Sequence, residues 1–147
     1  PYLICRLPNL VGKGQKEYQL FPSLVNQVLS KKVRVFERGE RDILDSADFM
    51  KILAELINLT LPSETINIVS GFSTLISDIV IHIKKSLQTT CSITTLRNGD
   101  KQKFSSSKLN ATLPWTATYF NDTYYKRVIN TYLPYYRKSS SGLRNRH

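Results

Sequence analysis

The chain contains 147 residues with a mass of 16.9 kDa, which is enough for one compact domain and too little for two of ordinary size. Hydrophobic residues make up 41% and charged residues 22%, a globular composition that excludes intrinsic disorder, collagen and coiled coil. No apolar run reaches the roughly 18 residues of a membrane-spanning helix, and residues 1–6 do not form a secretory signal, so we expect a cytoplasmic protein without a membrane partner.

The first part of the chain predicts two strand regions around a helix. Residues 2–7 are apolar apart from Arg6 and predict a buried strand that ends at Pro8, after which an irregular loop is expected. Pro22 opens a helix whose apolar side chains share one face. Short strands are predicted over residues 33–36 and 41–44, on either side of a charged turn.

A second helix is predicted to begin at Ser46, as its cap, and to end before Pro62. Residues 65–69 alternate as a strand. The clearest helix follows, with Ser73 as the expected cap. The expected buried stripes are Phe49, Met50, Leu53, Leu56 and Ile57 in the first of these helices and Ile76, Ile79, Val80, Ile83 and Leu87 in the second.

The last third predicts a strand over residues 92–96, a turn over 97–100 and an extended polar loop to Ser107. A final helix is expected from about residue 121 until Pro134 ends or kinks it. The alternation of strands and helices predicts an α/β fold. The expected buried side of the final helix consists of Tyr125, Val128, Ile129, Tyr132 and Leu133.

Three features suggest a piece of a longer protein. The chain begins at Pro1, its one methionine is the internal Met50, and an apolar run opens at once without a cap or linker. Residues 138–147 are rich in serine and basic residues and predict a flexible tail or a remnant of cloning.

The net charge of +10 is concentrated after residue 100, where nine basic residues face one acid, Asp122. Together with eight tyrosines, this charge could bind nucleic acid. No nucleic-acid-binding motif accompanies it, so we favour a solvated surface and do not expect nucleic acid as a partner. An anionic small ligand stays open.

Metal and redox sites are not expected. His82 and His147 are far apart, so no pair of histidines has ligand spacing, and no CxxC motif occurs. Cys5 and Cys91 are predicted to be buried free thiols. The nucleotide-binding GxGxxG and GxxxxGK(S/T) loops are also absent.

Arginines at the ends of predicted strands are the most informative polar residues. Arg41 and Arg97 each stand beside or near an aspartate, and Asn9 follows the first strand. Ligands of open α/β sheets bind outside the carboxyl ends of strands, and guanidinium groups suit diphosphates. From spacing alone, we favour an interpretation without a ligand. Arg41 would pair locally with Glu40, Asp42 or Asp45, and Arg97 would be a solvated turn residue.

Four segments in order resemble the extended short-chain dehydrogenases/reductases, the nucleotide-sugar epimerases and dehydratases. Residues 6–15, RLPNLVGKGQ, are similar to the family's R-x-x-N-x-(Y/V)-G-x-(G/R)-Q. Residues 41–48, RDILDSAD, resemble R-D-(F/Y)-(I/V)-H-V-x-D. Residues 66–79, INIVSGFSTLISDI, resemble the strand-to-helix segment that follows, and residues 104–115 resemble the D-x-S-K-x-x-x-L-G-W segment.

This resemblance implies the C-terminal portion of a Rossmann-type enzyme, with late sheet strands and a small α/β substrate domain over residues 1–137. It implies that the counterparts of Asn9, Arg41 and Arg97 bind the diphosphate of a nucleotide sugar and that those of Leu7 and Pro8 lie beside the nicotinamide. No tyrosine is followed by lysine four positions later, so the family's catalytic Tyr-x-x-x-Lys is absent.

The expected function is therefore nucleotide-sugar binding within an NAD- or NADP-dependent epimerase, dehydratase or reductase of carbohydrate or polysaccharide biosynthesis. The missing N-terminal Rossmann domain would bind most of the cofactor, and this chain alone is expected to be inactive, with no catalytic residue and no metal ligand. Exposed strand edges predict a homo-oligomer or pairing with another chain. The alternative is a non-catalytic basic module, either a degenerate paralogue or a nucleic-acid binder.

Overall fold

A computed structural model describes residues 1–137 of the chain, and the predicted tail over 138–147 lies outside the described residues. Within residues 1–137 the strands form four two-stranded sheets: β1 with β6, β2 with β5 and β3 with β8 are parallel, and β4 with β7 is antiparallel. The strands are β1 Leu3–Arg6, β2 Asn9–Val11, β3 Lys32–Phe36, β4 Glu40–Arg41, β5 Ile43–Asp45, β6 Glu64–Asn67, β7 Thr74–Leu75 and β8 Ser92–Leu96.

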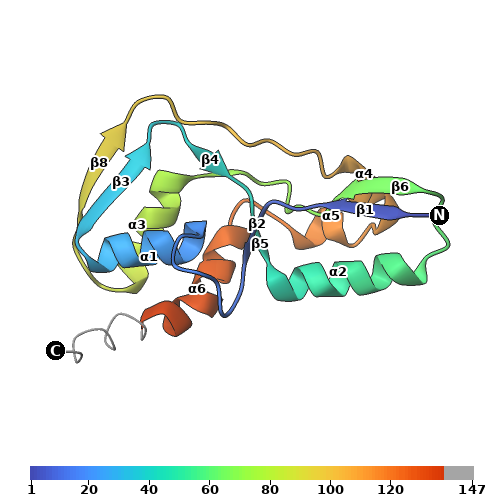
Figure 1. Ribbon diagram of the computed structural model, residues 1–147, viewed down its shortest axis with the longest axis horizontal. Helices are drawn as coiled ribbons and strands as arrows, with labels where there is room; N and C mark the ends of the chain where they lie inside the picture. Colours follow the sequence, from blue (N-terminus) through green and yellow to red (C-terminus); the bar gives the residue numbers. More distant parts are fainter. Residues whose placement is uncertain (138–147) are drawn as a thin grey trace.

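The helices pack between and beside these strand pairs (Figure 1). At one end α1 and α3 contact β3, at the other α2 and α4 lie beside β1 and β6, and α6 crosses the middle next to β5. The helices are α1 Leu20–Leu29, α2 Ser46–Asn58, α3 Ile76–Ser86, α4 Ser107–Thr112, α5 Thr116–Tyr119 and α6 Tyr124–Arg137. The mixed arrangement confirms the predicted α/β fold class.

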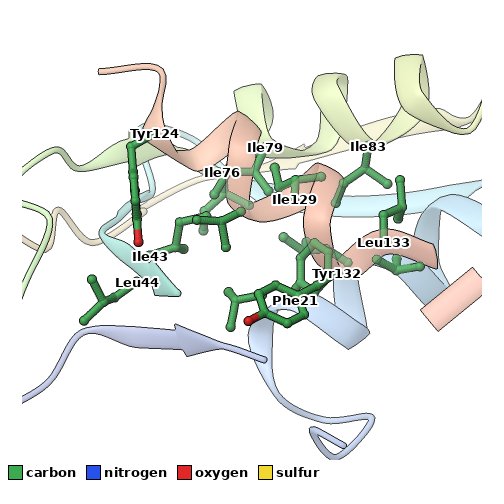
Figure 2. Packing of buried hydrophobic residues seen from close by; sticks show 14 of the residues in the cluster. Phe21, Ile43, Leu44, Ile76, Ile79, Ile83, Tyr124, Ile129, Tyr132 and Leu133 are labelled. Carbon is green, nitrogen blue, oxygen red and sulfur yellow. The ribbon is translucent and has the colours of Figure 1, made fainter. Parts of the chain in front are cut away.

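One hydrophobic core joins α1, β5, α3 and α6. Figure 2 shows their apolar side chains converging, with Phe21 on one side and Ile79 and Ile83 on the other side of α6. Burial of such side chains is the main favourable contribution to folding, at about 1.5–3 kcal/mol for each large apolar residue. The predicted face of α3 is confirmed for Ile76, Ile79, Val80 and Ile83, which are all buried, whereas Leu87 follows the last helical residue and is half-buried.

The predicted face of α2 is partly wrong. Leu56 is buried, but Met50 is 59% and Ile57 67% exposed, and Ile52 is fully buried instead. The buried line of α2 runs through Asp48, Ile52 and Leu56 at a spacing of four residues. Hydrogen bonds to the Asp48 carboxylate fix this rotation of the helix, as described below.

Several predicted boundaries also differ. Residues after Pro8 form a further strand, β2, where a loop was expected. The cap of α2 is Asp45, whose carboxylate accepts the Ala47 N–H at 2.8 Å, and Ser46 is the first helical residue.

At α3, the preceding Thr74 and Leu75 pair with β4, and the hydroxyl of Ser73 donates to the Gln102 carbonyl oxygen rather than capping the helix. Pro134 neither ends α6 nor prevents its continuation to Arg137, and Tyr124 rather than Tyr125 is the buried tyrosine at its start.

Both cysteines are free thiols, as predicted, but each is half-buried rather than fully buried. Partial burial raises the pKa of the Cys5 thiol. Among the helices of the described part, none is long and apolar enough to span a membrane.

Candidate functional site

A groove of about 370 Å³ lies where β1 passes into β2. It contains three of the five residues predicted to contact substrate or cofactor, since Leu7, Pro8 and Asn9 all line it, and neither Arg41 nor Arg97 is part of its wall. Apolar side chains and amides share the lining, a combination suited to a ligand with a flat apolar part and polar ends. The remaining lining residues are Leu10, Gln15, Gln19 and Leu20.

Asn9 connects three segments of the chain. Its backbone N–H donates to the Asp42 carbonyl oxygen at 3.2 Å, and its side-chain Nδ2 donates to the same oxygen at 3.3 Å and to Gln102 Oε1 at 3.2 Å. β2 is thereby joined both to the β4–β5 connection and to the loop after β8. A ligand that used the Asn9 amide would compete with these contacts.

Arg41 lies on β4 and reaches the same loop. Its Nη1 donates to the Glu40 carbonyl oxygen at 2.8 Å and to the Asp100 carbonyl oxygen at 3.0 Å. The favoured local pairing with a carboxylate is wrong, because both acceptors are backbone oxygens. A guanidinium has five N–H donors, so the Arg41 group retains donors on Nε and Nη2 for an anion.

Arg97 follows the last residue of β8 and is exposed. Within residues 1–137 its side chain takes part in no hydrogen bond or ion pair. The turn that it begins is held against the β3–β4 connection, because Gly99 N–H donates to the Glu37 carbonyl and Glu40 N–H to the Asp100 carbonyl. The backbone around Arg97 therefore lies near that of Arg41, whereas Asn9 reaches this region through Gln102.

Asp42 is a buried carboxylate that the sequence interpretation did not assign to the site. It is fully buried, and its two oxygens accept hydrogen bonds from Ser70 N–H at 3.3 Å, Ser70 Oγ at 2.8 Å and Gly71 N–H at 2.8 Å. Burial raises the pKa of Asp42, and these hydrogen bonds oppose the rise. The sequence signal for Asp42 was its position as the second residue of the RDILDSAD segment, directly after Arg41.

A second polar cluster joins α6 to the start of α2. Asp48 accepts from Tyr124 at 2.6 Å and Arg127 at 2.7 Å through Oδ2, and from Tyr119 at 2.8 Å through Oδ1. Desolvation raises the pKa of Tyr124, so its hydroxyl remains a donor. The sequence analysis assigned no role to Tyr119, Tyr124 or Arg127.

The neighbouring Asp45 carboxylate has the same role. Its Oδ1 accepts from the Tyr132 hydroxyl at 2.6 Å, and its backbone N–H donates to the Tyr124 hydroxyl at 3.0 Å. Both aspartates therefore fix the rotation of α6 against α2 and β5.

The loop beside the groove is braced by α6. The Tyr136 hydroxyl donates to the Gly12 carbonyl and accepts the Gln15 N–H at 3.0 Å. Gln15 Nε2 donates to the Leu10 carbonyl at 2.8 Å, so the loop closes on itself over the end of β2. Gln15, which lines the groove, is therefore held by Tyr136 of α6 and by Leu10 of β2.

Metal-ligand geometry is absent from the described part, where no group of three or more His, Cys, Asp or Glu side chains could hold an ion. His82 is half-buried on α3, and its Nε2 lies 2.9 Å from Asn130 Oδ1 on α6.

The fold is similar to those of solved nucleotide-sugar enzymes. UDP-glucuronic acid 4-epimerase from Bacillus cereus matches with a TM-score of 0.75 and 20% identity over 93% of this chain and 45% of its own. dTDP-glucose 4,6-dehydratase from Bacillus anthracis matches with a TM-score of 0.71 and 18% identity over 92% and 46%. UDP-glucose 4-epimerase from Thermus thermophilus matches with 0.67 and 16% over 93% and 47%.

The sequence matches no family model and no curated protein at a significant level. The chain spans less than half the length of the three solved enzymes that it resembles. The three enzymes share a fold with it at low identity. Residues 1–137 therefore have the fold of part of the NAD-dependent nucleotide-sugar epimerases and dehydratases, which confirms the predicted resemblance to extended short-chain dehydrogenases/reductases.

Proposed function

We propose that this chain is the nucleotide-sugar-binding portion of an NAD- or NADP-dependent epimerase, dehydratase or reductase. The observation that carries the proposal is the agreement in fold over 93% of the chain with an epimerase solved with UDP-glucuronic acid and NAD. The four motif segments occur along this fold in the order that the family has. The Rossmann half that would hold most of the cofactor is proposed to lie outside these residues.

In this function Asn9, Arg41 and Arg97 bind the diphosphate of the substrate. Two of them are anchored on one loop, since Asn9 Nδ2 donates to Gln102 and Arg41 Nη1 to the Asp100 carbonyl. The free donors of the guanidinium groups suit paired phosphate oxygens. Binding energy from the nucleotide, remote from the reacting carbon, would then orient the sugar.

The groove residues Leu7 and Pro8 fit the side of a nicotinamide, because they present apolar surface at the end of β1 beside the Asn9 amide. The cofactor, when bound, supplies the hydride acceptor. The sequence contains neither a glycine-rich loop nor Tyr-x-x-x-Lys, so the role of this chain is to bind and orient rather than to move a proton.

Isothermal titration of the complete gene product with UDP-glucose and dTDP-glucose tests the proposal. Arg41→Ala should weaken binding about tenfold or more, because a hydrogen bond to a charged group contributes about 1.5–3 kcal/mol. Arg34→Ala, at an exposed position of β3, is the control and should leave the affinity within about twofold. Equal effects of both substitutions, or no binding of either nucleotide sugar, would reject the proposed function.

Competitor DNA distinguishes the proposed nucleotide-sugar binding from the alternative, a basic module that binds nucleic acid. Nucleotide-sugar binding should be unaffected by random duplex DNA. Binding to that DNA alone, with a steep loss of affinity as salt rises, would instead support a nucleic-acid module.

A further inference from the structure

The side chains of Asn9 and Arg41 differ in how many donors they can offer to a ligand. The Arg41 guanidinium uses Nη1 for two backbone carbonyl oxygens and keeps further N–H groups for an anion. An asparagine amide has only two N–H donors, both on Nδ2. Asn9 uses one for the Asp42 carbonyl oxygen at 3.3 Å and the other for Gln102 Oε1 at 3.2 Å. A phosphate can therefore bind the Asn9 amide only if one of these contacts opens.

The contact between Asn9 and Gln102 is the one that can open at lower cost. The Asp42 carbonyl oxygen also accepts the Asn9 backbone N–H at 3.2 Å, beside the pairing of β2 with β5, so the backbone fixes it. Gln102 Oε1 lies instead at the end of a flexible side chain on a half-buried residue. After its release from Asn9, this oxygen can accept a hydrogen bond from water.

The backbone of Gln102 is held separately from its side chain. Its N–H donates to the Glu40 carbonyl oxygen at 3.3 Å, and its carbonyl oxygen accepts from the Ser73 hydroxyl. These contacts do not involve the side chain, so its replacement leaves the loop anchored. Gln102 is also not part of the groove wall to which Asn9 belongs. The side chain therefore influences the groove through Asn9.

An anionic acceptor competes effectively with Gln102 for the Asn9 donor. A hydrogen bond to an ionised oxygen is roughly twice as strong as one between neutral groups. The exchange of Gln102 Oε1 for a phosphate oxygen therefore gains free energy. The exchange of Gln102 Oε1 for a neutral oxygen of the ligand brings no such gain, so the contact favours ligands that carry phosphate.

We propose that Gln102 is a positioning residue that controls the Asn9 donor. It accepts from Asn9 Nδ2 until a phosphate oxygen of the ligand displaces it. This inference rests on the proposed function, in which Asn9 binds the diphosphate of a nucleotide sugar. The measured affinity for a nucleotide sugar then includes the cost of opening the contact between Asn9 and Gln102.

Calorimetric titration of the full-length protein with UDP-glucose and dTDP-glucose measures this cost. Gln102→Ala should bind about two- to tenfold more tightly, because one neutral hydrogen bond no longer has to open. Gln102→Glu should bind more weakly, since a carboxylate holds Nδ2 more firmly and repels the diphosphate. A side chain that only stabilised the loop would weaken binding in both variants. Weaker or unchanged binding in Gln102→Ala would overturn the inference.

A double substitution shows whether the effect passes through Asn9. In an Asn9→Ala background, Gln102→Ala should leave the affinity within about twofold. A gain that persisted there would mean that Gln102 obstructs the ligand directly, and it would overturn the inference.

Gln88→Glu is the matched control for charge. It makes the same change at an exposed residue after α3 and should leave the affinity within about twofold. A loss equal to that of Gln102→Glu would count against the inference. If the unsubstituted protein binds neither nucleotide sugar, the proposed function fails. If it binds one and Gln102→Ala brings no gain, this inference alone fails.

Discussion

The Asp42 carboxylate accepts hydrogen bonds from both the backbone N–H and the hydroxyl of Ser70, at 3.3 and 2.8 Å. This contact holds the segment that follows β6 against the connection between β4 and β5, where Asp42 directly follows Arg41. The position of the proposed diphosphate-binding arginine therefore depends on a buried carboxylate that does not face the ligand.

Asp42→Asn should destabilise the protein by about 2–4 kcal/mol, because an amide cannot accept from all three donors and leaves a buried N–H unsatisfied. Chemical unfolding monitored by circular dichroism measures the change. Asp122→Asn, on an exposed residue, should change the stability by less than about 0.5 kcal/mol. An unchanged free energy of unfolding in Asp42→Asn would show that the contacts with Ser70 do not stabilise this part of the fold.

Gly71 should tolerate alanine less well than Gly14, although both have a positive φ, +81° and +71°. A Cβ at Gly71 would lie 2.7 Å from Ser106 Oγ, whereas a Cβ at Gly14 has no neighbour within 4 Å. Gly14→Ala should cost about 1–2 kcal/mol from backbone conformation alone, and Gly71→Ala should cost measurably more. Thermal unfolding of the two variants provides the comparison, and equal losses would mean that Ser106 moves away freely.

Tyr124→Phe should reduce stability by about 1–3 kcal/mol, since it removes a donor to Asp48 and the acceptor of the Asp45 N–H. Tyr135→Phe is the matched control, because Tyr135 is half-exposed and the cation–π contact with Lys13 needs only its ring. Urea unfolding of both variants measures the difference. Similar values would indicate that Asp48 obtains its hydrogen bonds from other partners.

The contact between β6 and α4 should weaken in acid. Hydrogen bonding to Lys108 lowers the pKa of Glu64 below its ordinary value of 4.5. The pair therefore stabilises the folded chain above the unfolded-state pKa, and this contribution is lost as pH falls through the lower folded-state pKa. Exchange at the Thr65 amide, which donates to Glu64, should increase over that range after correction for intrinsic exchange. Glu64→Gln should abolish the dependence, and its persistence would assign it to another group.

Asn9→Asp should weaken nucleotide-sugar binding of the full-length protein about tenfold or more, because it places a carboxylate in the groove and removes the Nδ2 donor. Asn58→Asp, exposed at the end of α2, makes the same chemical change away from the groove. Calorimetric titration with UDP-glucose checks both. An unchanged affinity in Asn9→Asp would separate this groove from the substrate.

Hydrophobic periodicity predicted α3 well because the buried residues of that helix are all apolar. It failed at α2, where the rotation is set by polar contacts to Asp48 that no periodic pattern records. Pro134 does not end α6, and the buried side chains of Leu133 and Tyr136 lie on either side of it along the helix.

In the candidate site, too, some residues could be predicted from the sequence and others depend on tertiary contacts. Its groove residues Leu7, Pro8 and Asn9 are consecutive, so the sequence resemblance identified them together. The connection of Asn9 to Gln102 and of Asp42 to Ser70 joins residues far apart in the chain, and such pairings depend on the tertiary fold. Whether the two arginines and Asn9 bind one ligand remains a prediction for the titrations above.

Tyr136 contacts the Gly12 carbonyl across 124 positions of sequence. During synthesis on the ribosome the loop at Gly12 emerges before α6, so its contact with Tyr136 forms only after that helix has been made. The groove beside this loop therefore gains its final wall only after α6 has folded against it.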